Sequence, residues 1–304
     1  MDGIICVYKP NGYTSFDIIA IMRKLFNTKK IGHSGTLDPI AEGVLPVFVG
    51  AATKAVDYCP VHDKEYRAAF KIGLTTDTQD ITGRVLTEVP SATPCYVPLP
   101  RLKEAVNRFV GEIEQVPPMY SAIKVGGKKL YELARKGQEV ERQSRKITVH
   151  SIDIEEFNGN EGVLKVHCSK GTYIRTIIHD IGQELGFGAV MTALQRTKSN
   201  GFTLDDCYTL EHLREVHEQN SENLSALLSP IGELFDNVYP KASLNEHQTQ
   251  LFRNGVVLNA DLVKFDKVYD GLYSLYDCNN RIAGLAKIER DHSVKILQRF
   301  NYST

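Results

Sequence analysis

The spacing of apolar and polar residues along the chain predicts a mixture of strands and amphipathic helices. Residues 4–8, 64–73 and 163–169 follow strand patterns. Helical spacing of apolar residues occurs over residues 15–26, 102–110 and 172–185. Because strands and helices do not alternate regularly, we expect an α+β fold and exclude a Rossmann or barrel arrangement. Its core would be one large mixed or antiparallel sheet flanked by helices.

The pattern changes near Asp236, where we expect a domain boundary. An acidic, helix-prone stretch over residues 210–228 comes before this point. After it, three short apolar runs at residues 271–277, 282–288 and 294–299 alternate with turn-forming residues. The sequence therefore predicts a large domain over residues 1–235 and a small β-rich module over residues 236–304.

Charge is balanced over the whole chain but not within it. There are 36 basic and 37 acidic residues, a formal net charge of −1. Residues 119–149 carry eight basic and three acidic side chains, and residues 205–235 carry one basic and seven acidic. The basic stretch is suited to an anionic partner, although solvated lysines produce the same pattern more often.

Cysteine usage and hydropathy favour a reducing, cytoplasmic location. The six cysteines form no C-x-x-C pair and no cluster with histidine at metal-ligand spacing. The apolar stretch over residues 44–52 is too short for a membrane span and contains Pro46 and Gly50. The first residues do not resemble a signal or transit peptide, so we expect the mature chain to start here, without membrane association.

Several cofactor signatures are missing from the sequence. It contains no P-loop, no complete dinucleotide fingerprint, no G-x-S-x-G elbow and no zinc deaminase motif. We therefore expect no nucleotide, metal or other cofactor, and chemistry carried by ordinary side chains.

The segment KIGHSGTLDPIAEGVLPVFVG, residues 30–50, is the most unusual in the chain. Gly32, Gly35 and Gly43 surround Asp38, which precedes Pro39. Proline restricts the backbone before it, so the Asp38 carboxylate would project from a rigid turn. By itself this pattern is more typical of an Asx-turn or a helix N-cap than of catalysis.

The run GHSGTLDPIAEGVLPV resembles the catalytic motif of the TruB-type tRNA pseudouridine synthases. The segments ICVYKPNGYTSFD, KEYRAAFKIGLTTDTQDITG, PPMYSAIKVGGKKLYELARKG, SKGTYIRTIIHDIG and MTALQRTKSNGF resemble the same family in the same order. The resemblance covers roughly residues 3–230. The last part is similar, more weakly, to the PUA-type RNA-binding domain that often ends such chains.

This resemblance implies that the chain isomerises uridine-55 in the TΨC loop of tRNA to pseudouridine, with Asp38 as the essential residue. The carboxylate has three open roles: nucleophile at the sugar, nucleophile at the base, or base removing a sugar proton. A carboxylate in a closed pocket needs a cationic partner to stay ionised, and Arg175 matches that position. Tyr66 matches the tyrosine that stacks on the uracil.

The family pattern also implies substrate contacts around these residues. Lys9 would contact a phosphate or the active site, and Asp80 would organise Arg175 or substrate. Leu194 would pack against the flipped base, and His33 would fill the gap left by flipped nucleotides.

The basic stretch coincides with an insertion of the family, at about residues 119–149, that closes over the RNA arm. Its phosphate contacts would come from Lys124, Lys128 and Lys129. Gly126 and Gly127 would act as its hinge.

Two alternatives to a stand-alone tRNA enzyme remain open from the sequence. One is a guide-RNA-dependent synthase of the dyskerin type, which requires partner proteins. The other is a non-catalytic protein that binds or folds tRNA. The long basic insertion, the absence of lysine-rich tails and the intact Asp38, Tyr66 and Arg175 set favour the enzyme acting alone, as a monomer.

Overall fold

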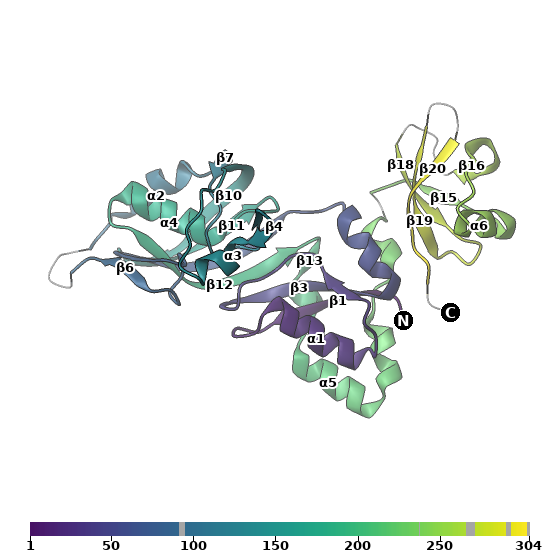
Figure 1. Ribbon diagram of the computed structural model, residues 1–304, viewed down its shortest axis with the longest axis horizontal. Helices are drawn as coiled ribbons and strands as arrows, with labels where there is room; N and C mark the ends of the chain where they lie inside the picture. Colours follow the sequence, from purple (N-terminus) through teal and green to yellow (C-terminus); the bar gives the residue numbers. More distant parts are fainter. Residues whose placement is uncertain (91–94, 237, 266–270, 290–292, 303–304) are drawn as a thin grey trace.

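The computed structural model describes the chain in five stretches, residues 1–90, 95–236, 238–265, 271–289 and 293–302. These stretches form an elongated molecule with a large sheet domain and a small β-rich module at one end (Figure 1). The α+β class predicted from the sequence is confirmed.

A ten-stranded mixed sheet organises the large domain. Its main path runs β14-β1-β3-β12-β4-β11-β10-β7, with β2 paired to β3 and β13 paired to β12. The strands are β1 (Gly3–Lys9), β2 (Ile31–His33), β3 (Ala41–Val49), β4 (Lys64–Ile72), β7 (Gly111–Gln115), β10 (Arg145–Phe157), β11 (Glu161–Cys168), β12 (Ala189–Ser199), β13 (Phe202–Thr203) and β14 (Cys207–Tyr208). The β1–β14 and β3–β12 pairs are parallel and the other pairs are antiparallel.

Short elements extend from this sheet. They are the hairpins β5 (Leu74–Thr76) with β6 (Val85–Glu88) and β8 (Lys124–Val125) with β9 (Lys128–Lys129), helix α3 (Leu130–Ala134), and the 3₁₀ turns η1 (Gly50–Tyr58), η2 (Leu204–Asp206), η3 (Ser221–Leu227) and η4 (Ile231–Leu234).

Two pairs of helices cover different parts of the sheet. Helices α2 (Leu99–Asn107) and α4 (Ile174–Leu185) bury apolar side chains in one core with β4, β10, β11 and β12. Helices α1 (Ser15–Leu25) and α5 (Leu210–Gln219) share a second core with β1 and β3. The sheet thus joins two cores, and the strands between them, β3 and β12, cross the middle of the domain (Figure 1).

The C-terminal module contains a separate six-stranded sheet, in the order β16-β20-β19-β18-β15-β17. Its elements are β15 (Lys241–Ser243), α6 (Glu246–Arg253), β16 (Leu258–Asn259), η5 (Ala260–Leu262), β17 (Lys264–Phe265), β18 (Leu272–Tyr276), β19 (Ile282–Ile288) and β20 (Ser293–Arg299). A shared apolar cluster joins the module to the large domain and includes Phe48, Phe235 and Phe300. The rings of Phe235 and Phe300 stack with centroids 6.1 Å apart.

The helix expected over residues 210–228 is wrong in its second half. Helix α5 ends at Gln219, and the Asn220 side chain accepts a hydrogen bond from the backbone of Glu222. That contact caps the separate turn η3, because asparagine competes with helix continuation by bonding to nearby backbone groups.

Residues 41–49 lie in the Gly- and Pro-containing segment 30–50, for which no strand is predicted, and they form the central strand β3. This strand is buried almost throughout, so it shows an unbroken apolar run in place of alternation. The long strands β10 and β12 also went unpredicted.

Close packing of α4 on β12 gives a test of the fold. A Cβ on Gly182 would lie 2.1 Å from the backbone nitrogen of Ala189. We expect Gly182→Ala to push α4 off the sheet and lower the free energy of unfolding by about 1–3 kcal/mol, as overpacking does. Urea unfolding would measure this, with the exposed Gln183→Ala on the same helix as the control. Equal stability of both variants would contradict the packing described.

Candidate active site

Asp38 lies in the connection between the paired strands β2 and β3. The backbone N–H of Leu37 donates to the Ser15 hydroxyl at 2.9 Å, and that hydroxyl donates back to the Leu37 carbonyl at 3.3 Å. On the other side, the N–H of Gly12 donates to the Pro39 carbonyl at 2.9 Å. The connection from β1 to α1 and the first residue of α1 therefore hold the loop on both sides of Asp38, as the rigid turn predicted from the sequence requires.

Of the two roles expected for Lys9, a phosphate contact or an active-site contact, the structure supports the second, because Lys9 holds this loop. Its side chain is fully buried at the end of β1. The Nζ atom donates to the carbonyls of Pro10 at 3.0 Å, Pro39 at 3.4 Å and Ala41. Burial lowers the pKa of Lys9 to about 8, against the opposing effect of Asp38. Lys9 is thus a positioning residue that RNA does not reach.

Arg175, in the first turn of α4, is the ion-pair partner of Asp38. Its Nε atom lies 2.9 Å from Asp38 Oδ2, and its Nη1 atom lies 3.6 Å from Asp80 Oδ2. The guanidinium also donates to the carbonyls of Thr78 at 2.9 Å and Tyr120 at 3.0 Å. One buried cation therefore joins four segments of the chain.

Asp80 faces Arg175 and is nearly inaccessible, which favours its organising role over substrate contact. Its Oδ1 atom accepts from the Thr78 hydroxyl at 2.9 Å and from both the backbone and the hydroxyl of Thr82, at 3.0 and 2.5 Å. Only 5% of Asp80 is exposed. The other carboxylate oxygen of Asp80, Oδ2, faces the guanidinium of Arg175.

The Asp38 carboxylate is densely surrounded and yet open on one side. Burial raises its pKa above the usual value of 3.8, Asp80 raises it further, and Arg175 and Lys9 oppose the rise. About 35% of the side chain remains exposed. The Asp38 carboxylate is therefore accessible to a substrate, while the buried guanidinium of Arg175 favours its ionised form.

Tyr66 and Leu194 pack in the same apolar core as Leu37, the residue that precedes Asp38. Each is 6% exposed. Burial raises the pKa of Tyr66 to about 12, although the guanidinium of Arg196 opposes this. The phenol is therefore neutral near pH 7. Leu194 lies on β12 directly opposite Ala68 of β4.

His33 ends β2, and the Nδ1 atom of its ring accepts a hydrogen bond from the backbone of Gly35 at 3.2 Å. Its ring meets Phe16 edge-on, with centroids 6.1 Å apart. Burial, with a smaller contribution from Arg196, lowers the pKa of His33, so the imidazole is neutral. Insertion of His33 into RNA stays a prediction.

Arg196 is a site residue that the sequence reasoning missed. It is fully buried on β12, opposite Tyr66 of β4. Its Nε donates to the Val44 carbonyl at 2.8 Å and its Nη2 to the Gly35 carbonyl at 3.2 Å, while Nη1 has no hydrogen-bond partner among the described residues. In a strand, residues two positions apart face the same side of the sheet. A strand predicted over residues 189–199 would therefore have placed Arg196 on the same face as Leu194.

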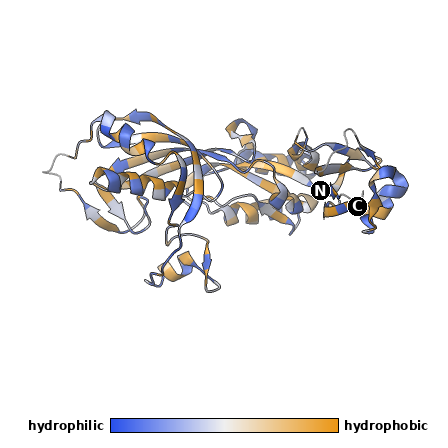
Figure 2. Ribbon diagram, turned by 90° about the horizontal axis from the view of Figure 1, so that it is seen from above, coloured by the Kyte–Doolittle hydropathy of each residue, from blue (hydrophilic) through white to orange (hydrophobic). Residues whose placement is uncertain are grey.

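The basic insertion carries its lysines on the hairpin β8–β9. Lys124 lies directly opposite Lys129, and Lys128 follows the turn; Lys124 and Lys128 are exposed. The Nζ of Lys129 lies 5.4 Å from the ring centroid of Tyr131 and 6.0 Å from that of Phe16. Facing lysines repel one another, so an anionic ligand between them would be favoured. The insertion projects from the sheet domain in Figure 2.

Two expectations about this insertion need correction. Gly126 and Gly127, expected as its hinge, form the tip of the hairpin with φ of 58° and 82°, as a two-residue type I′ turn requires. The insertion also ends before residue 149, because Arg145 and Lys146 already pair with β7 in the large sheet.

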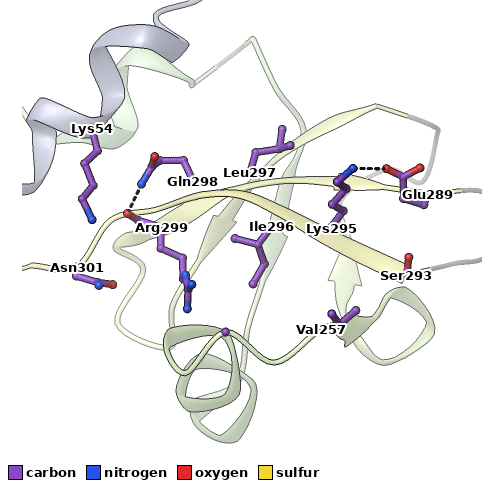
Figure 3. A pocket seen from close by; sticks show the side chains of 11 residues that line it. Lys54, Val257, Glu289, Ser293, Lys295, Ile296, Leu297, Gln298, Arg299 and Asn301 are labelled. Atoms are coloured by element: carbon purple, nitrogen blue, oxygen red, sulfur yellow. Dashed lines mark hydrogen bonds and ion pairs between the residues drawn. The ribbon is translucent and has the colours of Figure 1, made fainter.

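A groove of 790 Å³ in the C-terminal module has a separate set of lining residues. Three of them are basic, with Lys54 reaching from η1 toward β20, which carries Lys295 and Arg299 (Figure 3). Lys295 is partly neutralised by Glu289, 3.9 Å away. None of the residues around Asp38 lines this groove.

The arrangement around Asp38 suits chemistry by a single ionised carboxylate. An accessible carboxylate is held by a buried guanidinium beside apolar walls and a neutral phenol. No helix among the described residues is long and apolar enough to cross a membrane.

Family models match most of the chain. A model described as the N-terminal domain of the TruB family pseudouridylate synthases matches residues 23–174. A second, the C-terminal domain of tRNA pseudouridylate synthase B, matches residues 175–236. Both matches lie within the large sheet domain and leave the β-rich module outside them.

Similar curated proteins are named tRNA pseudouridine synthase B. The Clostridium perfringens protein is 43% identical over 289 residues, 94% of this chain and 95% of its own length. The protein of Clostridium kluyveri is 40% identical over 300 residues, 99% and 100% of the two chains. That of Levilactobacillus brevis is 43% identical over 267 residues, 86% of each.

Solved structures agree on the fold. A chain of the Cbf5-Nop10-Gar1 complex has a TM-score of 0.73 and 27% identity, covering 98% of this chain and 85% of that one. A chain of the archaeal box H/ACA Nop10-Cbf5 complex has a TM-score of 0.71 and 25% identity, covering 98% and 86%. Because the tRNA synthase relatives are far more similar in sequence, the guide-dependent alternative is not favoured.

The motifs, the family models and these relatives agree with one another, and the chain belongs to the TruB family of pseudouridylate synthases.

Proposed function

We propose that the chain is a tRNA pseudouridine synthase that isomerises uridine-55 of the TΨC loop, with Asp38 as its catalytic residue. The observation that carries this proposal is the accessible Asp38 carboxylate, 2.9 Å from buried Arg175 and next in the chain to Leu37, which packs in the same apolar core as Tyr66 and Leu194. We propose further that it acts as a cytoplasmic monomer.

The reaction moves one bond without any redox change. The bond from N1 of uracil to C1′ of ribose breaks, the uracil turns while held, and C5 bonds to C1′. The hydrogen on C5 leaves as a proton and N1 takes one up. Whether Asp38 attacks the sugar, attacks the base or removes a sugar proton, the step needs the ionised carboxylate. Arg175 supplies the positive charge that keeps it ionised inside the pocket.

Tyr66 and Leu194 would receive the uracil once it leaves the RNA stack. Unstacking costs roughly a few kcal/mol, which contacts with aromatic and apolar side chains offset. The neutral Tyr66 can stack on the base without adding charge. His33 would occupy the space that the flipped nucleotide leaves.

Two basic surfaces would hold the rest of the RNA. The hairpin that carries Lys124, Lys128 and Lys129 would contact phosphates of the TΨC arm. The basic groove of the PUA-like C-terminal module offers a second contact. The module's role as an RNA-binding domain rests on this charge and on its small β-rich sheet.

The first prediction concerns Asp38 itself. In tritium release from C5-labelled uridine in unmodified tRNA, we expect Asp38→Asn to lose at least about 10³-fold in rate, because no ionisable carboxylate remains to form or accept a bond. Binding of tRNA should change little. The exposed Asp153→Asn is the matched control, and EDTA should not slow the wild type. Activity retained by Asp38→Asn would refute the assignment.

The second prediction concerns pH. The raised pKa of Asp38 means that activity falls as pH drops through that value, which lies above 3.8. Arg175 lowers this pKa, so its weaker replacement in Arg175→Lys should move the acid limb of the single-turnover rate to higher pH. Rates between about pH 5 and pH 8 would show it. An acid limb that stays in place or moves to lower pH would contradict the ion pair's role.

The third prediction concerns the hairpin. Replacing Lys124 and Lys128 by Gln should weaken tRNA binding and reduce the slope of log affinity against log salt by about 1–2, because fewer counterions are released. The single-turnover rate at saturating enzyme should remain close to wild type. Lys103→Gln, on the exposed side of α2, controls for net charge. An unchanged slope would exclude phosphate contacts by these lysines.

A further inference from the structure

Asp63, His150 and His167 gather at one place on the surface, although they come from separate parts of the chain. Asp63 directly precedes β4, while His150 and His167 lie on β10 and β11. Their potential ligand atoms all lie within 4.8 Å of one another. The Nε2 atom of His150 is 3.1 Å from Asp63 Oδ2, and the two imidazole centroids are 4.6 Å apart.

A β-bulge explains why the two histidines face the same way. The pairing of β10 with β11 shifts between Val149 and Ser151, so that His150 is the extra residue. A bulge turns the side chain of its extra residue out of the regular alternation. His150 thereby stands next to His167, the partner of Ser151 in the ladder.

These donors match the preferences of one class of ion. Imidazole nitrogen and carboxylate oxygen are ligands of Zn²⁺, and three such ligands leave a fourth tetrahedral position for water. Tetrahedral zinc separates its ligand atoms by about 3.3 Å, so modest side-chain rotations from the present spacing suffice. Since His150 and Asp63 remain 37% and 44% exposed, an ion can enter from solvent.

We propose that Asp63, His150 and His167 form a binding site for Zn²⁺ that is separate from the Asp38 site. The bound ion cross-links β10, β11 and the residues leading into β4, and so stabilises the sheet beside the strand that carries Tyr66. It takes no part in the isomerisation. No sequence pattern indicates this site, because the three ligands are spread from residue 63 to residue 167 without a metal-binding spacing.

The experiment uses the full chain after treatment with EDTA and its removal. Titration calorimetry with Zn²⁺ should show one site, and Zn²⁺ should raise the Tm of the wild type by mass action. We expect His150→Ala and His167→Ala each to weaken this site by at least about tenfold and to abolish the Tm shift. Co²⁺ should give the visible absorption of a tetrahedral ion in the wild type and not in His150→Ala or His167→Ala.

His247→Ala, an exposed histidine of α6, is the matched control and should bind like wild type. Cys278→Ser removes an exposed thiol, which is another type of zinc ligand, and should leave the site unchanged. Absence of binding by the wild type, or equal binding by His150→Ala and His247→Ala, would overturn the proposal. All of these variants should release tritium at the wild-type rate, so this test is independent of the role of Asp38.

Discussion

The ion pair between Arg175 and Asp38 is the interaction on which the rest of the site depends. Arg175 is 4% exposed, and its guanidinium contacts two carboxylates and the carbonyls of Thr78 and Tyr120. A buried charge is tolerated only when its partners are complete, and removal of one partner typically costs about 3–5 kcal/mol. The loop of Asp38, the Asp80 turn, the start of the insertion and helix α4 are therefore fixed relative to one another by a single side chain.

Other buried cations act on the same loop without a carboxylate partner at hydrogen-bonding distance among the described residues. Lys9 donates to three carbonyls below Asp38, and Arg196 donates to the carbonyls of Gly35 and Val44. Carbonyl oxygens carry only partial charge, so these contacts offset desolvation incompletely, as the lowered pKa of Lys9 shows. The positive charge of Lys9 adds to that of Arg175 and lowers the pKa of Asp38.

Sequence reasoning found the residues whose motif is distinctive, and it failed where burial hides the pattern. Asp38 and Arg175, far apart in the chain, were paired from their motifs and lie 2.9 Å apart. The strand that follows Asp38 was missed, because a strand buried on both faces has no alternation to detect. The family pattern assigned Lys9 to a phosphate or the active site, and only the folded structure shows that it is buried and donates to three carbonyls of the Asp38 loop and its neighbours.

The distribution of charge separates recognition of the base from recognition of the RNA backbone. Around Asp38, the buried cations already have partners: Arg175 contacts Asp38 and Asp80, and Lys9 and Arg196 donate to backbone carbonyls. The phosphates of the RNA must therefore bind at another surface. The exposed lysines of the β8–β9 hairpin supply a positive surface away from Asp38. A chain with a net charge of −1 can bind a polyanion only through such local separation.

The link between the two surfaces is Tyr120, since it begins the insertion and its carbonyl accepts directly from Arg175. Displacement of the insertion therefore acts on the cation that sets the charge of Asp38.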